Sequence, residues 1–133
     1  MRKTLTVVAI LIALVTVLLV SLPTILHKAG LHPEYNGPTA ELPGKRALII
    51  TTSHGVLAAP GETDGPATGV MASEFTHPYY TFLDGGMEVD MASIRGGEIP
   101  IDPQTLRFVI RSPEDDRYLE DPIAQAKVKN SIP

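Results

Sequence analysis

An uncharged apolar run from Leu5 to Leu22 constrains this 133-residue chain more than any other feature. It follows Arg2 and Lys3, and it contains nothing more polar than threonine or serine. As an α-helix the run spans about 27 Å at about 1.5 Å per residue, close to the hydrocarbon thickness of a bilayer. We therefore expect residues 1–27 to form a membrane segment that contacts lipid through residues 5–22.

Two kinds of amino-terminal segment share this pattern, a retained signal-anchor and a cleaved signal peptide. Cleaved signals have a shorter apolar region of about 7–15 residues and a small-x-small cleavage site. Here the run is longer, and "SLPTILHKAGLHPE" contains no Ala-x-Ala site. We favour a retained anchor, with secretion after cleavage as the alternative. A buried helix of a soluble protein is disfavoured because such a helix rarely lacks a polar face over five turns.

The composition of the chain excludes several classes of function. It has no cysteine, so it forms no disulfide, no zinc-thiolate site and no cysteine nucleophile of its own. Residues 45–133 contain more acidic than basic side chains. This balance disfavours nucleic acid as a partner, because nucleic-acid binding needs a basic surface. No motif predicts a cofactor.

The segment after the anchor is expected to be an extended linker. Residues 28–44 are rich in proline and glycine and have no periodic apolar pattern. His27 and His32 are interpreted as ordinary polar residues of this region. The chain thus divides into an anchor at 1–27, a linker at 28–44 and a folded part at 45–133.

The folded part opens with a predicted strand, helix and strand. Residues 47–50 form a continuous apolar run, typical of a strand buried on both faces of a parallel sheet. A helix is expected from Thr68 or Gly69 until Gly85 and Gly86 end it. Residues 87–93 alternate in polarity and indicate a second strand. The apolar side of the predicted helix contains Val70, Phe75, Tyr79, Phe82 and Leu83. Together these elements make one βαβ unit of a parallel α/β sheet.

The pattern weakens after this unit. Residues 94–106 are expected to form a turn-rich loop, and 107–112 fit either a short strand or an irregular helix. A second helix is expected from Asp121, a natural N-cap that is followed by proline, with Lys127 and Lys129 near its carboxyl end. Two strands are too few to close a core of their own.

Four segments in this order resemble the ThiJ/PfpI family. They are the strand ending in Ser-His, "GVMASEFTHPYY", "GMEVDMAS" and "GGEIPIDP". The resemblance covers residues 45–133 and is greatest to the branch that contains glyoxalase-III-type enzymes and holding chaperones. It implies the amino-terminal half of a class I glutamine amidotransferase-like fold, here a partial flavodoxin-like parallel sheet behind one transmembrane helix.

The resemblance assigns a role to Glu74, which lies four residues before Pro78. In the family the corresponding acid hydrogen-bonds the nucleophilic cysteine. A proline one turn later lacks an N–H and crowds the carbonyl of residue 74, so we expect the helix to bend there. A bend would hold Glu74 at the carboxyl end of the first strand, where open α/β sheets place their sites.

The same resemblance places the family's cysteine, the histidine after it and its glycine-rich oxyanion loop beyond the part that matches here. We therefore expect an anchored, truncated family member that is catalytically inactive alone. The alternative is half of a split glyoxalase-III-like or deglycase-like enzyme, or of a chaperone, that acts on small reactive carbonyls or damaged proteins. Two protein partners remain open, a second copy and a complementary carboxyl-terminal fragment.

Other polar residues offer weaker candidates. His54 and His77 could bind a metal with Glu62 or Glu74 as third ligand, but no HxH or HExxH spacing supports this, and we expect no metal site. His77 is expected to pack beside Pro78 against the sheet. Ser53 lacks a Gly-x-Ser-x-Gly elbow and is not expected to be a nucleophile.

The charge asymmetry around the apolar run predicts the topology of the chain. Arg2, Lys3 and the amino terminus outweigh Lys28, so the amino terminus should stay in the cytoplasm and residues 45–133 should lie outside it. A periplasmic alkaline phosphatase fused after Pro133 should be active, and a fused cytoplasmic β-galactosidase inactive. The reverse pair of activities would contradict this topology.

Overall fold

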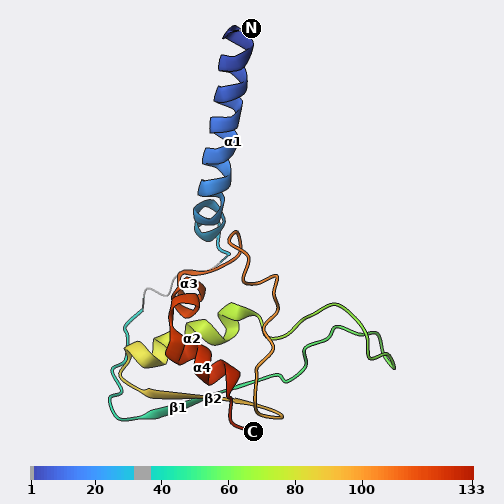
Figure 1. Ribbon diagram of the computed structural model, residues 1–133. Helices are drawn as coiled ribbons and strands as arrows, with labels where there is room; N and C mark the ends of the chain where they lie inside the picture. The colour runs from blue at the N-terminus through green and yellow to red at the C-terminus, as the bar shows by residue number, and fades with distance from the viewer. Residues whose placement is uncertain (1, 32–36) are drawn as a thin grey trace. The chain divides into compact units, whose positions relative to one another are not determined.

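The computed structural model describes residues 2–31 and 37–133 (Figure 1). His32 and the middle of the predicted linker therefore lie outside the described residues. The chain divides into two compact units, Met1–Tyr35 and Asn36–Pro133. The first unit contains α1 (Arg2–Lys28). The second contains, in chain order, β1 (Arg46–Thr51), α2 (Ala72–Asp84), β2 (Glu88–Ser93), α3 (Pro113–Glu120) and α4 (Pro122–Lys129).

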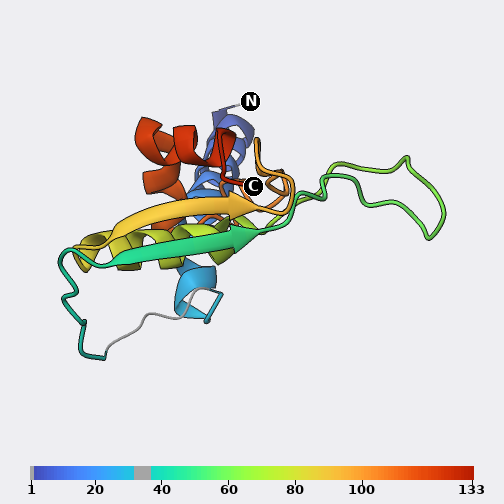
Figure 2. The ribbon, with the colours of Figure 1, turned by 90° about the horizontal axis from the view of Figure 1, so that it is seen from below.

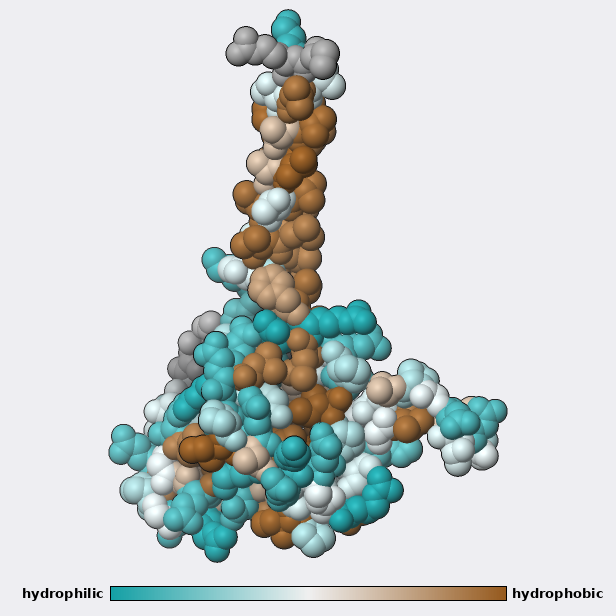
Figure 3. All heavy atoms as spheres, viewed as in Figure 1, coloured by the Kyte–Doolittle hydropathy of each residue, from teal (hydrophilic) through white to brown (hydrophobic). Residues whose placement is uncertain are grey.

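Helix α1 is long and apolar enough to cross a membrane over Lys3–Lys28, and none of its most apolar stretch is buried. Apolar side chains cover most of the visible face of this helix (Figure 3). Two of its hydroxyls bond to the helix backbone, Thr16 Oγ1 to the carbonyl of Ile12 at 2.9 Å and Ser21 Oγ to the carbonyl of Leu18 at 3.2 Å. These bonds suit a helix in lipid, where water cannot satisfy polar groups. A signal sequence near the amino terminus can pass the same test of length and composition.

The second unit is a mixed α/β structure built on a two-stranded parallel sheet, as the sequence predicts. Strand β1 pairs with β2 in a register that runs from Arg46 opposite Glu88 to Thr51 opposite Ser93. Helix α2 connects the strands and packs on one face of the sheet (Figure 2). Gly86, at φ 82°, closes the end of α2 in a conformation that glycine adopts without strain. The buried side chains at this interface are Phe75, Tyr79, Ile49, Val89 and Met91.

The prediction that β1 is buried on both faces is wrong. Ile49 is buried, but Leu48 is 54% exposed and Ile50 is 71% exposed. The register aligns Ile49 with the buried Met91, on the face that α2 covers. Leu48 and Ile50 alternate with Ile49 and so point to the opposite face. Among the described helices and strands, β1 contacts only β2 and α2, so no helix covers this second face.

Helix α2 begins at Ala72, later than the predicted start at Thr68 or Gly69. The preceding residues pair with a distant segment instead, because the Val70 amide donates to the Pro100 carbonyl at 2.9 Å and the Val70 carbonyl accepts from the Asp102 amide at 3.0 Å. Pro78 lies inside α2, which is assigned as one helix from Ala72 to Asp84. The missing N–H of Pro78 leaves the carbonyl of Glu74 without its usual helical donor.

The carboxyl-terminal part contains one helix that was not predicted. Helix α3 begins with a capping box in which the Ser112 hydroxyl and the Asp115 carboxylate bond each other's backbone amides, and Pro113 follows the cap. Residues 103–110 form turns, so this segment is neither a strand nor a regular helix. The prediction for α4 is confirmed, since Asp121 caps it and Lys127 and Lys129 lie in its last turn.

Buried polar contacts attach α3 to α2. The Thr76 hydroxyl donates to Asp115 Oδ1 at 2.6 Å, and both residues are almost fully buried. The rings of Phe75 and Tyr118 meet edge to face at 5.1 Å beside this bond. The second carboxylate oxygen of Asp115 holds the Ser112 amide at 2.8 Å. The buried carboxylate therefore joins two helices, and both of its oxygens are hydrogen-bonded.

A narrow arm projects from the sheet between β1 and α2 (Figure 2). Its two sides are joined by a bridge between Val56 and Ala67 and by a bond from the Leu57 amide to the Pro66 carbonyl at 2.9 Å. At the base, the Thr68 amide donates to the Gly55 carbonyl at 3.0 Å. Most of the side chains beyond this base are exposed.

The close approach of Gly69 to Pro100 predicts a sensitive position. A Cβ at Gly69 would lie 2.1 Å from the Pro100 carbonyl oxygen, although the backbone of Gly69 is not left-handed. Gly69→Ala should therefore destabilise the unit through steric displacement alone, by about 1–3 kcal/mol. Urea-dependent proteolysis of the full chain in detergent measures this.

Gly55→Ala is the matched control, because its new carbon would meet the Pro100 side chain at 3.1 Å. A side chain yields more easily than a backbone carbonyl, so this variant should lose less stability. Equal losses for the two variants would contradict the steric explanation.

Candidate functional site

The carboxyl ends of β1 and β2 and the first turn of α2 lie at the same end of the unit (Figure 2). The loops that leave the two strands are joined there. The Arg95 amide donates to Ser53 Oγ at 2.9 Å, and the Arg95 guanidinium donates to the Ser53 carbonyl. Ser53 therefore has a structural role in this arrangement, as a link between the loops.

Glu74 occupies the first turn of α2, at this end of the sheet. Its amide donates to the Met71 carbonyl at 3.0 Å. The residue is exposed, and in the described part of the chain no hydrogen bond or ion pair engages its carboxylate. A solvated carboxylate without a nucleophile or a proton donor beside it can exchange protons with water but cannot by itself direct a covalent reaction.

The two candidate histidines do not form a metal site with these acids. His77 Nε2 lies 3.2 Å from Glu114 Oε2 of α3, so His77 faces α3 and does not pack against the sheet as predicted. The cause is the packing of α3 on this side of α2, where the neighbouring Thr76 bonds Asp115. His54 is exposed in the loop after β1. Within residues 2–31 and 37–133, no three His, Cys, Asp or Glu side chains are grouped closely enough to hold a metal ion.

The amino ends of the strands form a second polar region, at the opposite end of the sheet. An open groove of about 370 Å³ lies here, between the end of α2, the start of β2 and α4. Its lining is Arg46, Tyr79, Leu83, Met87, Glu88, Val89, Asp90, Asp121, Ile123 and Lys127.

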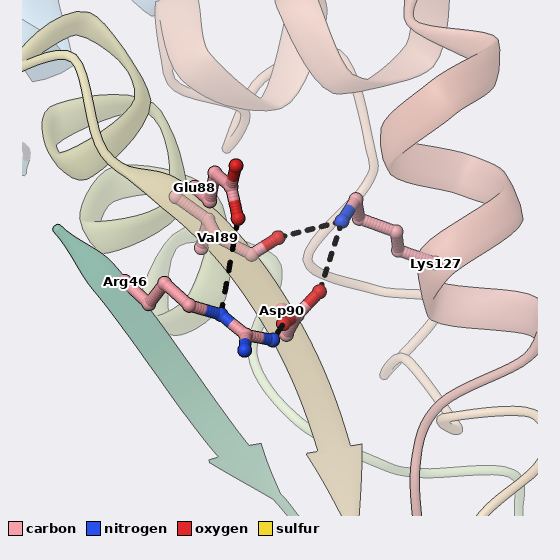
Figure 4. A network of polar contacts seen from close by, with 5 residues as sticks. All are labelled: Arg46, Glu88, Val89, Asp90 and Lys127. Carbon is pink, nitrogen blue, oxygen red and sulfur yellow. Dashed lines mark hydrogen bonds and ion pairs between the residues drawn. The ribbon is translucent and has the colours of Figure 1, made fainter. Parts of the chain in front are cut away.

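A network of charges occupies one side of this groove (Figure 4). Asp90 accepts from Arg46 at 2.7 Å and from Lys127 at 3.2 Å. Arg46 also lies 3.8 Å from Glu88. The hydrogen bonds from Arg46 and Lys127 hold the pKa of Asp90 below its ordinary value, and the same bond to Asp90 raises the pKa of Arg46. Because these charges bind one another, the network fastens β1, β2 and α4 together and leaves little free charge for a ligand.

A buried tyrosine attaches α2 to α4 near the groove. The Tyr80 hydroxyl donates to Asp121 Oδ2 at 3.2 Å, while Asp121 Oδ1 caps α4. Burial, followed by the nearby charge of Asp121, raises the pKa of Tyr80, so the phenol stays protonated and can donate. Arg117 stacks over the Tyr80 ring at 4.1 Å. This cluster is structural, and no sequence motif identified it.

Comparison with known proteins gives similarity to solved structures only, because no family model and no curated protein matches the chain. The X-ray structure of Rapid Encystment Protein 24 KDa (REP24) of Francisella tularensis is 39% identical, covers 66% of this chain and 36% of that chain, and gives a TM-score of 0.55. The crystal structure of APC35852 is 32% identical, covers 67% of this chain and 34% of that chain, and gives a TM-score of 0.50. The chain thus spans about a third of the length of these two proteins.

The charge network predicts a pH dependence of stability. Because the pKa of Asp90 is lower in the folded state than its usual value of about 3.9, its contribution is present above that value and is lost as the pH falls below it. Asp90→Asn should therefore be less stable than the wild type at pH 7 and should lose less stability between pH 5 and pH 3.

Protease protection of the full chain at each pH measures this difference. Glu62→Gln, which removes an exposed acid in the arm, serves as the control and should follow the wild type. Superimposable pH profiles for Asp90→Asn and the wild type would contradict a role for the network.

Proposed function

We propose that this chain is a membrane-anchored protein whose residues 45–133 form the amino-terminal part of a ThiJ/PfpI-type α/β unit, inactive as a catalyst on its own. The observation that carries the proposal is the environment of Glu74. This acid lies at the end of the sheet where open α/β folds place their sites, yet it is exposed and its carboxylate has no partner among the described residues.

The chemistry of such a site explains why Glu74 alone is insufficient. An acid that assists a nucleophile must share a hydrogen bond with it and must sit in a partly desolvated pocket. The nucleophile in the proposed family is a thiolate, and these 133 residues contain no cysteine. Solvent surrounds Glu74, so neither condition is met here.

The proposed location rests on α1. A helix of this length and composition can hold the second unit at a bilayer surface. In the proposed arrangement the amino terminus is cytoplasmic, residues 5–22 contact lipid and residues 45–133 lie outside the cytoplasm. The flavodoxin-like arrangement of the complete sheet is part of the same proposal and is supported by the parallel β1 and β2 pair with its α2 crossover.

A second candidate function is favoured by a separate observation. The chain spans about a third of REP24 and of APC35852, and one face of β1 is uncovered. A complementary polypeptide that covered this face and brought a cysteine to Glu74 would complete a unit of glyoxalase-III or deglycase type. Its substrates would be small reactive carbonyls, and a chaperone acting on damaged proteins is the related alternative.

Assays of methylglyoxal consumption test the proposal. The full chain in detergent should consume no more methylglyoxal than its Glu74→Gln variant, because neither contains a nucleophilic sulfur. A Glu62→Gln variant controls for the loss of one exposed carboxylate. Glu74-dependent turnover by the chain alone would overturn the proposal.

The second candidate is tested by complementation with the part of the REP24 chain that lies outside the matched 36%. If the candidate is correct, the mixture should gain activity that is lost with Glu74→Gln and kept with Glu62→Gln. A mixture without activity, despite stable association of the two polypeptides, would exclude a split enzyme of this kind.

A further inference from the structure

The start of α2 is capped by a residue from a distant part of the chain. The N-cap position is Met71, whose side chain makes no capping hydrogen bond. The amide of Ala72, the first residue of the helix, donates instead to Thr105 Oγ1 at 3.1 Å. By contrast, α3 and α4 are capped by their own N-cap residues, Ser112 and Asp121. The start of α2 therefore depends on a residue that lies 33 positions later in the sequence.

The Thr105 hydroxyl uses both of its hydrogen-bonding functions in this contact. It donates to the Asp102 carbonyl at 2.7 Å, so its lone pairs are left to accept from the Ala72 amide. Ala72 is fully buried, and a buried amide without an acceptor is destabilising. A serine can make the same two bonds, whereas a valine of the same shape can make neither.

The segment that contains Thr105 passes beside the start of α2 and is fastened there (Figure 1). The Asp102 amide donates to the Val70 carbonyl at 3.0 Å, and the Asp102 carboxylate accepts from the Thr68 hydroxyl at 3.4 Å. The Thr105 amide donates to the Asp102 carbonyl at 3.0 Å, which closes a turn. The backbone of Thr105 is thus fixed relative to the residues before α2, and its hydroxyl is a rigid support.

Glu74 lies in the helical turn that this contact supports. Pro78 has no N–H, so the Glu74 carbonyl lacks its usual helical donor. One of the bonds that would join the first turn of α2 to the next turn is therefore missing. The bond from Ala72 to Thr105, two residues before Glu74, supplies an external attachment for this turn.

We propose that Thr105 is a positioning residue for Glu74, because its hydroxyl fixes the first turn of α2 and with it the place of the carboxylate at the end of the sheet. The inference rests on the proposed function, since Glu74 has a chemical role only in a unit that a complementary polypeptide completes. In such a unit the acid must lie within hydrogen-bond reach of a thiolate, and a displacement of about 1 Å can lower the rate roughly a hundredfold. Thr105 acts through α2 and not on the reacting groups.

Backbone amide signals from isotope-labelled glutamates in the full chain in detergent report this role without any activity. The Glu74 signal is assigned as the one that disappears in Glu74→Gln. Thr105→Val should shift it and should leave the signals of Glu62 in the arm and Glu120 in α3 unchanged. Thr105→Ser should restore the wild-type position, because it restores both hydrogen bonds. A Glu74 signal that Thr105→Val does not move would overturn the proposal.

Thr51→Val is the matched control. It also removes one threonine hydroxyl bond, here from Thr51 Oγ1 of β1 to the Ala92 carbonyl of β2 at 3.2 Å. This variant should leave the Glu74 signal in place. Equal shifts in Thr51→Val and Thr105→Val would show a general loosening of the unit and would contradict a positioning role.

Turnover by the complemented unit gives the functional measurement. In the mixture with the remaining part of REP24, Thr105→Val should lower kcat roughly tenfold or more with KM nearly unchanged, because Glu74 acts after the substrate has bound. Thr105→Ser should keep most of the turnover, and an unchanged kcat in Thr105→Val would overturn the proposal. A wild-type mixture without turnover would count against the split enzyme alone, and the amide signals would still decide whether Thr105 holds Glu74 in place.

Amide hydrogen exchange in the wild-type chain keeps the test informative if Thr105→Val does not fold. Amides in the first turn of a helix lack intrahelical acceptors and are commonly unprotected. The Ala72 amide should instead exchange within about tenfold of the Tyr79 amide in the middle of α2, because Thr105 protects it. Exchange of Ala72 at the rate of an unprotected amide would show that the hydroxyl does not hold the helix start, and this result would overturn the proposal.

Discussion

The packing of α2 on one face of the β1 and β2 pair is the interaction on which the rest of the second unit depends. Two parallel strands do not form a stable structure alone, because parallel sheets require covering elements. Phe75 and Tyr79 supply that cover over Ile49, Val89 and Met91, and each such side chain contributes about 1.5–3 kcal/mol when fully buried. Helices α3 and α4 then attach to α2 through the Thr76–Asp115 and Tyr80–Asp121 hydrogen bonds. The strands and both later helices are thus organised around one helix.

Local sequence signals predicted the helix ends that neighbouring residues determine. Asp121 followed by Pro122 marks the start of α4, and Gly86 closes α2 with a positive φ. Helix α3 was not predicted because its sequence is mostly polar and has no apolar periodicity. The capping pair Ser112 and Asp115 does indicate a helix start at this position. The start of α2 was misplaced because Val70 pairs with a segment thirty residues away, and local periodicity does not report such pairing.

The candidate site also contains features that the sequence could predict and features that depend on tertiary packing. A resemblance in sequence could single out Glu74, but its exposure depends on which neighbours the fold supplies. Alternation in β2 could place Glu88 and Asp90 on one face. The pairing of Asp90 with Lys127, however, needs α4 to lie beside β2, and the position of His77 needs α3 to lie beside α2. The prediction that β1 is buried on both faces was wrong, because the elements that cover a sheet face are distant from the strand in sequence.

The arm between β1 and α2 has a practical consequence for protein engineering. Its two sides are held together at the base by the Thr68 to Gly55 and Leu57 to Pro66 bonds, so the chain leaves the folded unit after β1 and returns to it before α2 at nearly the same place. The residues beyond, including Gly61 and Glu62 at the turn, are exposed. An exposed loop whose two sides lie close together accepts an inserted domain with little strain. A fluorescent protein or an affinity module inserted at this turn should therefore leave the native connections of α1, β1 and α2 unchanged.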